Sequence, residues 1–304
     1  MQRRHFIQNT LAASAALTVP AALSANTATT APKFKMKYGP HDGMFAANGG
    51  DIFGQIQFAA DHGFTGWEDN GMMGRSVQDQ EKMGNLMAKL GISMGVFVVG
   101  FDGWPPNTTL TSGDKKWREK FLTACKEAVN VAKRCNAKFM TVVPGNFDRS
   151  LPMGIQTANV IESMRRACDI FEPHGLVMVM EPLSDTPDLF LRHSDQTYMI
   201  CKAVNSPSCK ILYDIYHMQR NEGQLISNID LCWDEIAYFQ IGDEPGRKEP
   251  TTGEINYNFL FKHIHDKAKA NKQEFIMGME HGNMFAGKEG EQKLIKAYVQ
   301  SDNF

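Results

Sequence analysis

From residue 34 onward, the sequence repeats a two-part unit: a short apolar run with the loop that follows it, and then a longer segment with apolar residues at helical spacing. The apolar runs are residues 34–39, 64–68, 93–100, 139–145, 176–182, 210–216, 236–242 and 275–282. The helical segments are residues 50–62, 77–90, 115–134, 153–173, 194–205, 222–231, 256–271 and 287–300. The pattern predicts eight strands that alternate with eight helices.

Strict alternation indicates parallel strands with right-handed crossovers, and eight such units close most simply into a (β/α)8 TIM barrel. The alternative, an open doubly wound sheet, usually carries a glycine-rich phosphate loop after its first strand. Here the first strand leads into GPHDGMF, which has neither the GxGxxG spacing nor a Walker lysine. The chain has 304 residues, of which 42% are hydrophobic, so it can bury one barrel core of about 250 residues. We predict a single barrel domain over residues 31–304.

The first 25 residues differ from the rest. MQRRHFIQNT contains Arg3 and Arg4, and a weakly apolar run that ends in small residues follows it. This pattern resembles an export signal of the twin-arginine type. A membrane anchor is one alternative, but Pro20 interrupts the run and about 20 apolar residues would be needed; a frayed amphipathic terminus is another. We predict that residues 1–30 are a signal, removed or disordered, and that the protein is periplasmic without stable membrane insertion.

Charge and cysteine content narrow the choices further. The formal net charge is -2, which argues against a nucleic-acid binder, because such proteins usually carry a basic face. None of the 6 cysteines lies in a CxxC pair. An even count in an exported chain permits disulfides, but the twin-arginine route carries proteins that are already folded. Buried thiols are therefore the simpler prediction.

Polar side chains follow the last four predicted strands, in the segments MEPLSD, YDIYHMQ, FQIGDEPGR and MEHGN. Their first polar residues are Glu181, Asp214, Gln240 and Glu280. In a barrel the carboxyl ends of the strands meet at one mouth, so these four side chains should converge there. A single carboxylate at such a position is usually a helix cap or an ion-pair partner, but four oxygen-bearing side chains in register favour a shared site.

Converging carboxylates need a positive partner, because unit charges about 4 Å apart repel by about 4 kcal/mol at an effective dielectric near 20. Oxygen ligands without cysteine suit Mn²⁺, Mg²⁺ or Co²⁺. His217 lies one helical turn after Asp214, which makes it a candidate donor to a substrate, although a structural histidine is the alternative. Arg247, in PGRKEP, could point at a substrate oxygen or lie in solvent.

The segments MEPL, YDIYHMQ, FQIGDEPGRKEPTTGEINY and MGMEHG, in this order, resemble the hydroxypyruvate isomerase branch of the xylose isomerase-like barrels, which also includes ketose 3-epimerases. The resemblance covers most of residues 36–300. It implies a divalent metal held by a Glu, an Asp, a His or Gln, and a second Glu. The matching residues here are Glu181, Asp214, Gln240 and Glu280. In the family the two glutamates also act as acid and base, moving a proton beside a carbonyl through an enediolate.

The resemblance also implies substrate contacts. It assigns this role to His217 and Arg247, and it places Glu254, in GEIN, near the substrate loop. Trp67 and Glu68 resemble a family Val-Glu pair, for which we predict a place in the pocket wall. Relatives often form dimers or tetramers, so a homo-oligomer is a further expectation.

Two features depart from the family. Ser184 stands where the family usually has Asn, which could change a polar contact near Glu181. The export signal is the second departure, because hydroxypyruvate metabolism belongs in the cytoplasm. Both departures leave the substrate open.

The residues therefore allow several functions. The first is a metal-dependent isomerase or epimerase of a small ketose or keto acid. The second is an exported lyase that uses the same proton abstraction for elimination on 3-keto-glycosides or related oxidised sugars. A non-catalytic sugar-binding barrel is a third, although all four ligand positions are intact. An apurinic endonuclease is not favoured, because relatives with that activity use three metals and several histidines, whereas only His217 and His281 lie close to these motifs.

Overall fold

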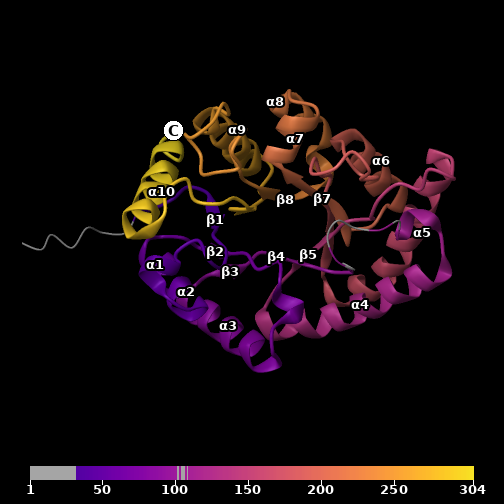
Figure 1. Ribbon diagram of the computed structural model, residues 1–304, viewed down its shortest axis with the longest axis horizontal. Coiled ribbons are helices and arrows are strands. Elements are labelled where there is room, and N and C mark those ends of the chain that lie inside the picture. The colour runs from indigo at the N-terminus through magenta and orange to yellow at the C-terminus, as the bar shows by residue number, and fades with distance from the viewer. Residues whose placement is uncertain (1–31, 101–102, 104–106, 108) are drawn as a thin grey trace, which may run out of the picture. The chain divides into compact units, whose positions relative to one another are not determined.

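The computed structural model describes residues 32–304 except 101, 102, 104–106 and 108. The predicted export signal, residues 1–30, lies outside the described residues, and residues 31–304 form one unit. Short parallel strands lie at its centre with helices around them (Figure 1). The strands are β1 (Lys37–Gly39), β2 (Gly66–Trp67), β3 (Ser93–Met94), β4 (Val96–Val98), β5 (Phe139–Val142), β6 (Val177–Met180), β7 (Cys209–Asp214), β8 (Ile236–Gln240) and β9 (Ile276–Gly278).

The strands close into a ring, as predicted for a TIM barrel. Seven strands are hydrogen-bonded in the order β1-β9-β8-β7-β6-β5-β4, and β2 pairs with β3. A parallel bridge between His41 and Glu68 joins β1 to β2. There the Glu68 backbone N–H donates to the Pro40 carbonyl oxygen at 2.9 Å. Because β3 continues directly into β4, these links complete the barrel.

Gly95 divides the predicted strand 93–100 into β3 and β4. A Cβ at this position would lie 2.3 Å from the Tyr238 hydroxyl oxygen, so the close approach of Tyr238 requires glycine here. The Gly95 N–H still donates to the Trp67 carbonyl at 2.7 Å, while β4 pairs with β5. The chain therefore changes partners at Gly95, a step that the continuous apolar run did not predict.

The predicted strand 210–216 is wrong at its end, because β7 stops at Asp214 and helix α7 (Ile215–Asn221) begins at once. The Asp214 carboxylate causes this change. Its Oδ1 accepts hydrogen bonds from the backbone N–H groups of Tyr216 at 2.8 Å and His217 at 3.2 Å, which caps the new helix.

The eight predicted helices are confirmed with shifts of a few residues at their ends. They are α2 (Ile52–Asp61), α3 (Val77–Leu90), α4 (Lys115–Cys135), α5 (Met153–Phe171), α6 (Ser194–Val204), α8 (Leu225–Cys232), α9 (Tyr257–Ala270) and α10 (Gly287–Ser301). Helix α3, which has its predicted bounds, shows what fixes helix ends: the Ser76 side chain accepts from the Asp79 N–H at its start, and Gly91 takes a left-handed conformation at its end. The short helices α1 (Ala46–Gly49) and α7 were not predicted.

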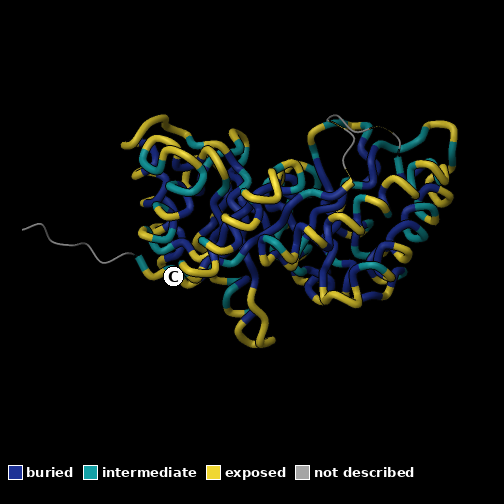
Figure 2. The backbone as a smooth tube through the Cα atoms, turned by 90° about the horizontal axis from the view of Figure 1, so that it is seen from below, coloured by how far each residue is buried: buried dark blue, intermediate teal, exposed yellow. Residues whose placement is uncertain are grey.

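Alternate residues of each strand face opposite sides of the barrel wall and so build two cores. A small cluster fills the inside of the ring: Val96, Val177, Val179, Leu212, Tyr238 and Ile276. A larger cluster lies between the strands and the helices and includes Met178, Tyr213 and Phe239. In Figure 2 the buried residues (dark blue) lie in the interior of the described part of the protein. The side chains that continue these inward-facing rows past the strand ends are therefore the ones that reach the mouth of the barrel.

Candidate active site

The four predicted metal ligands continue the inward-facing rows of their strands. They are Glu181, Asp214, Gln240 and Glu280. The residues two positions earlier are Val179, Leu212, Tyr238 and Gly278; the first three belong to the inner core and the fourth ends β9. Because side chains repeat every two residues along a strand, all four ligands point into the barrel at its carboxyl end. The structure therefore brings the predicted set to one mouth.

Glu181, Asp214 and His217 form the tightest group. Each offers one ligand atom, and these three atoms lie within 4.8 Å of one another. The His217 Nε2 atom is 3.5 Å from Asp214 Oδ2 and 4.0 Å from Glu181 Oε1. All three residues are buried, so their interactions are poorly screened by water.

His217 has a defined proton position. Its Nδ1 accepts the Ser184 backbone N–H at 3.2 Å and lies 2.8 Å from the Ser184 hydroxyl. A backbone N–H can only donate, so Nδ1 carries no proton and the neutral ring holds its proton on Nε2. Burial lowers the pKa of His217 although Asp214 opposes the shift, which favours the neutral ring. His217 is therefore suited to donate a hydrogen bond from Nε2 rather than to bind a metal through it.

Arg247 supplies the positive charge beside the carboxylates. Its Nη2 lies 2.9 Å from Glu280 Oε2 and 3.3 Å from Asp214 Oδ2. The guanidinium also lies over the Tyr216 ring, 5.1 Å from its centre. Burial acts to lower the pKa of Arg247, but Glu280 and Asp214 outweigh it and raise the pKa. The guanidinium therefore remains charged.

The two glutamates hold protons more tightly than exposed carboxyls do. Burial, followed by the charges of Glu280 and Asp214, raises the pKa of Glu181 well above its ordinary value. Burial also raises the pKa of Glu280 to about 7; Arg247 opposes this shift and Asp214 adds to it. One guanidinium therefore does not balance the carboxylates gathered here.

Some buried atoms at the site lack a partner. Over the described ranges, Glu181 Oε1, Gln240 Oε1 and His217 Nε2 make no hydrogen bond. Buried polar atoms are normally paired, and two unpaired oxygens beside ionisable carboxylates suit a hard divalent cation. The residues present therefore fit a metal site made of oxygen ligands.

Two residues near the site were missed by the sequence analysis. Asn70 donates from Nδ2 to Glu280 Oε1 at 2.9 Å. Asp185 Oδ2 lies 3.8 Å from His217 Nε2, and its Oδ1 lies 4.0 Å from Arg247 Nη1. Asn70 lies two residues after Glu68 at the end of a predicted strand, so the strand-end rule could have found it. Asp185 lies within MEPLSD but beyond the strand, where the alternation of a strand no longer predicts which way a side chain points.

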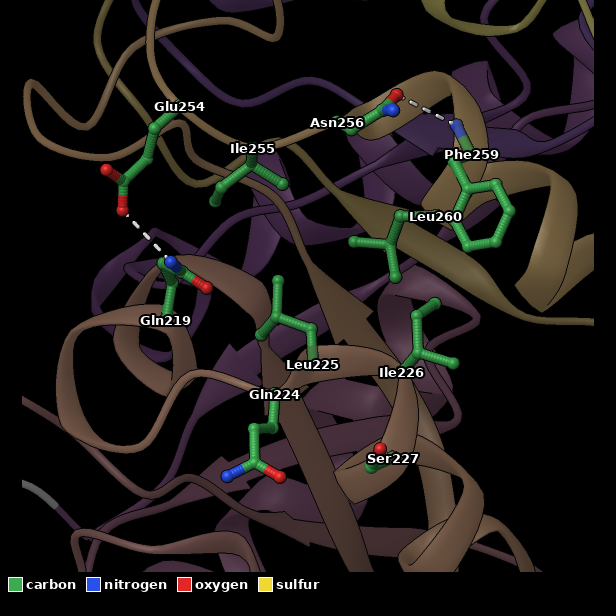
Figure 3. Close-up of a pocket in the computed structure, with 10 residues that line it drawn as sticks. All are labelled: Gln219, Gln224, Leu225, Ile226, Ser227, Glu254, Ile255, Asn256, Phe259 and Leu260. Atoms are coloured by element: carbon green, nitrogen blue, oxygen red, sulfur yellow. Dashed lines mark hydrogen bonds between the residues drawn. The ribbon is translucent and has the colours of Figure 1, made fainter.

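The remaining predicted substrate contacts are Trp67, Glu68 and Glu254, and of these Glu68 hydrogen-bonds a predicted metal ligand. Trp67 packs in the outer core, on the opposite side of β2 from Glu68. Glu68 is buried and binds Gln240 and Tyr238. Glu254 is exposed, and its Oε1 accepts from Gln219 Nε2 at 2.9 Å, at one end of a groove between α8 and α9 (Figure 3). The roles assigned to Trp67, Glu68 and Glu254 remain predictions.

Among the described residues, no helix is both long and apolar enough to cross a membrane. All six cysteines are buried and free, as the simpler prediction had them.

Comparison with known proteins gives concordant matches. The model of the xylose isomerase-like TIM barrel family matches residues 56–293. Hydroxypyruvate isomerase of Escherichia coli (strain K12) is 29% identical over 228 residues, which cover 72% of this chain and 87% of that protein. The 2-oxo-tetronate isomerase of Cupriavidus necator is 31% identical over 123 residues, 40% of this chain and 46% of that protein.

Solved structures agree on the fold. The 3-keto-D-glucoside 4-epimerase YcjR from E. coli aligns with a TM-score of 0.72 at 17% identity, covering 88% of this chain and 100% of that one. An AP endonuclease of family 2 from Brucella melitensis aligns with a TM-score of 0.71 at 21% identity, covering 84% and 96%. At these identities the match shows a common barrel.

Proposed function

Because this chain belongs to the xylose isomerase-like TIM barrel family, we propose that it is a divalent-metal-dependent isomerase or epimerase of a small ketose or keto acid. The Escherichia coli relative that aligns over 87% of its own length is a hydroxypyruvate isomerase. The observation that carries the proposal is the group of unpaired buried oxygens on Glu181 and Gln240 beside Asp214.

In this proposal, the metal is held by oxygen ligands from four strands. They are Glu181, Asp214, Gln240 and Glu280. Mn²⁺, Mg²⁺ and Co²⁺ all accept such ligands. A bound divalent cation supplies positive charge for the oxygen of the substrate carbonyl, which makes the neighbouring C–H more acidic.

The two glutamates of this chain move the proton. One removes a proton beside the carbonyl to give an enediolate, and the other delivers a proton to complete the product. Asn70 orients the Glu280 carboxylate by donating to Oε1.

His217 and Arg247 bind and orient the substrate. The Nε2–H of His217 points toward the carboxylate cluster, where it donates to a substrate oxygen. Ser184 holds the ring in this state through Nδ1. Arg247 adds a guanidinium charge that Glu280 holds beside the site through Nη2.

A second candidate keeps this machinery but ends in elimination, on a 3-keto-glycoside or a related oxidised sugar. Asp185 favours a neutral keto sugar over a keto acid as the substrate of either reaction, because its carboxylate lies beside both His217 and Arg247 and would repel an anionic substrate. A neutral keto sugar avoids that repulsion.

A product assay separates these candidates. Protein loaded with Mn²⁺ is incubated with hydroxypyruvate, with free ketoses and with 3-keto-glycosides, and the products are weighed by mass spectrometry. Isomerisation or epimerisation conserves mass, whereas elimination releases a fragment. We expect conversion of at least one substrate and loss of conversion after chelation. Conversion that survives complete removal of the metal would contradict the proposal.

A further inference from the structure

Glu68 lies beside Gln240 inside the barrel, and we propose that it is a positioning residue that turns the amide oxygen of Gln240 toward the metal site. The inference rests on the proposed function, since it concerns a ligand of that site. Glu68 Oε1 accepts a hydrogen bond from Gln240 Nε2 at 2.8 Å. Both side chains are buried, at 1% and 0% exposure, so water does not compete for this contact.

The contact matters because the two ends of an amide differ. Only the oxygen of Gln240 can bind a cation, whereas its NH₂ group can only donate. Glu68 Oε1 holds that NH₂ group, so Gln240 Oε1 is turned away from Glu68, and it has no hydrogen-bond partner within the described part of the chain. The free oxygen is then available to a cation.

The orientation does not depend on the charge of Glu68. Its other oxygen, Oε2, lies 2.9 Å from the Tyr238 hydroxyl, which can donate to a carboxylate or accept from a carboxylic acid. In either state Oε1 remains an acceptor for Gln240. Tyr238 therefore anchors Glu68 through the carboxyl oxygen that Gln240 does not use.

The barrel leaves space for this pair through two glycines. A Cβ on Gly278 would lie 1.7 Å from Glu68 Oε2, and a Cβ on Gly95 would lie 2.3 Å from the Tyr238 hydroxyl oxygen. Glu68 and Tyr238 thus occupy space that a side chain at position 278 or 95 would fill. Its enclosure suits a residue that acts through Gln240 rather than one that touches a substrate.

The test is the affinity for Mn²⁺, measured by calorimetric titration of metal-free protein. The four proteins are the wild type, Glu68→Met, Gln240→Glu and the double variant. With Gln240 present, Glu68→Met should lower Mn²⁺ affinity by about 10- to 100-fold, as the loss of a residue that orients a ligand does. In the Gln240→Glu background, both terminal atoms at position 240 are oxygens and need no orientation, so Glu68→Met should not lower the affinity.

Two results would overturn the inference. One is an unchanged affinity when Glu68→Met is made beside Gln240. The other is the same loss in both backgrounds, which would mean that Glu68 only supports the fold. A wild type that binds no Mn²⁺ would overturn the proposed function and this inference with it, so the two failures can be told apart.

A second variant covers the case in which Glu68→Met does not fold. Glu68→Leu also removes the acceptor for Gln240 Nε2, with a side chain shorter than that of methionine. We expect lower Mn²⁺ affinity beside Gln240 and none of that loss in the Gln240→Glu background. Glu291→Gln is the matched control, because Glu291 is also buried but accepts from the backbone of Ala47 and Asn48. Its Mn²⁺ affinity should equal that of the wild type.

Discussion

At the scale of single residues, Asp214 contributes to both the fold and the site. Its Oδ1 caps α7, and its Oδ2 faces Arg247 and His217. The two roles that the sequence allowed, a helix cap and a site carboxylate, therefore occur together. Replacing Asp214 would disturb the helix as well as the cluster, so it is a poor choice for testing chemistry. Glu280 is a better choice, because its side chain accepts from Asn70 and Arg247 rather than from a helix backbone.

The raised pKa of Glu280 predicts a pH-dependent stability. Its pKa in the folded protein is about 7, against an ordinary value of 4.5, so in the metal-free protein the folded state binds the extra proton between these values. The stabilising contribution is complete below about pH 4.5 and is lost as the pH rises through about 7. We expect the free energy of unfolding of metal-free protein, measured with denaturant, to fall over this range relative to Glu280→Gln.

Saturating Mn²⁺ should remove that decline, because the cation favours the ionised carboxylate. If the wild type and Glu280→Gln follow the same pH profile without metal, the assigned environment of Glu280 is wrong.

At the scale of elements, close contacts between helices depend on small residues. Gly84 in α3 faces the C-terminal end of α4, where an added Cβ would lie 2.3 Å from the Arg134 carbonyl oxygen and 2.8 Å from the Cys135 Cα. Both atoms belong to the backbone and cannot turn aside. Gly154, near the start of α5, has nothing within 4 Å of its Cβ position.

This pair predicts opposite effects of the same substitution. Gly84→Ala should destabilise the protein by about 1–3 kcal/mol, because α3 and α4 must move apart. Gly154→Ala should stabilise it by about 0.5–1 kcal/mol, since alanine loses less backbone entropy in a helix. Denaturant unfolding of both variants checks this, and equal effects would contradict the packing described for α3 and α4.

The sequence predicted most elements because their periodicities are local. The helices have apolar residues three or four apart, and the strands have apolar runs. Two departures, the break at Gly95 and the early start of α7, arise from contacts that periodicity does not contain: the Tyr238 hydroxyl near Gly95 and the capping carboxylate of Asp214. The convergence of the four candidate ligands was predictable because each lies at or just beyond the end of a strand. The Glu68–Gln240 contact was not, since 172 positions separate the two residues.

At the scale of the whole molecule, the barrel turns eight separate strand ends into one mouth. That convergence explains why four segments spread over about 100 residues of sequence, from Glu181 to Glu280, can form a single site. The role of the loop after β4 could not be predicted from the sequence, because loop shape does not follow from strand periodicity.

We also propose that the N-terminal segment exports the protein. In this prediction, replacing both Arg3 and Arg4 with Lys blocks the twin-arginine route. Fractionation of cells should find the wild type in the periplasm and the variant in the cytoplasm. The same distribution for both proteins would contradict a twin-arginine signal.

The central claim is that Glu181 and Glu280 move a proton beside a substrate carbonyl. The direct measurement is exchange of that proton with D₂O, followed by nuclear magnetic resonance on a substrate that the product assay has identified, at saturating Mn²⁺. We expect exchange in the wild type and in the control Glu291→Gln. Glu181→Gln and Glu280→Gln should each slow it by about 100- to 10,000-fold. Exchange at the wild-type rate in either glutamate variant would contradict the account.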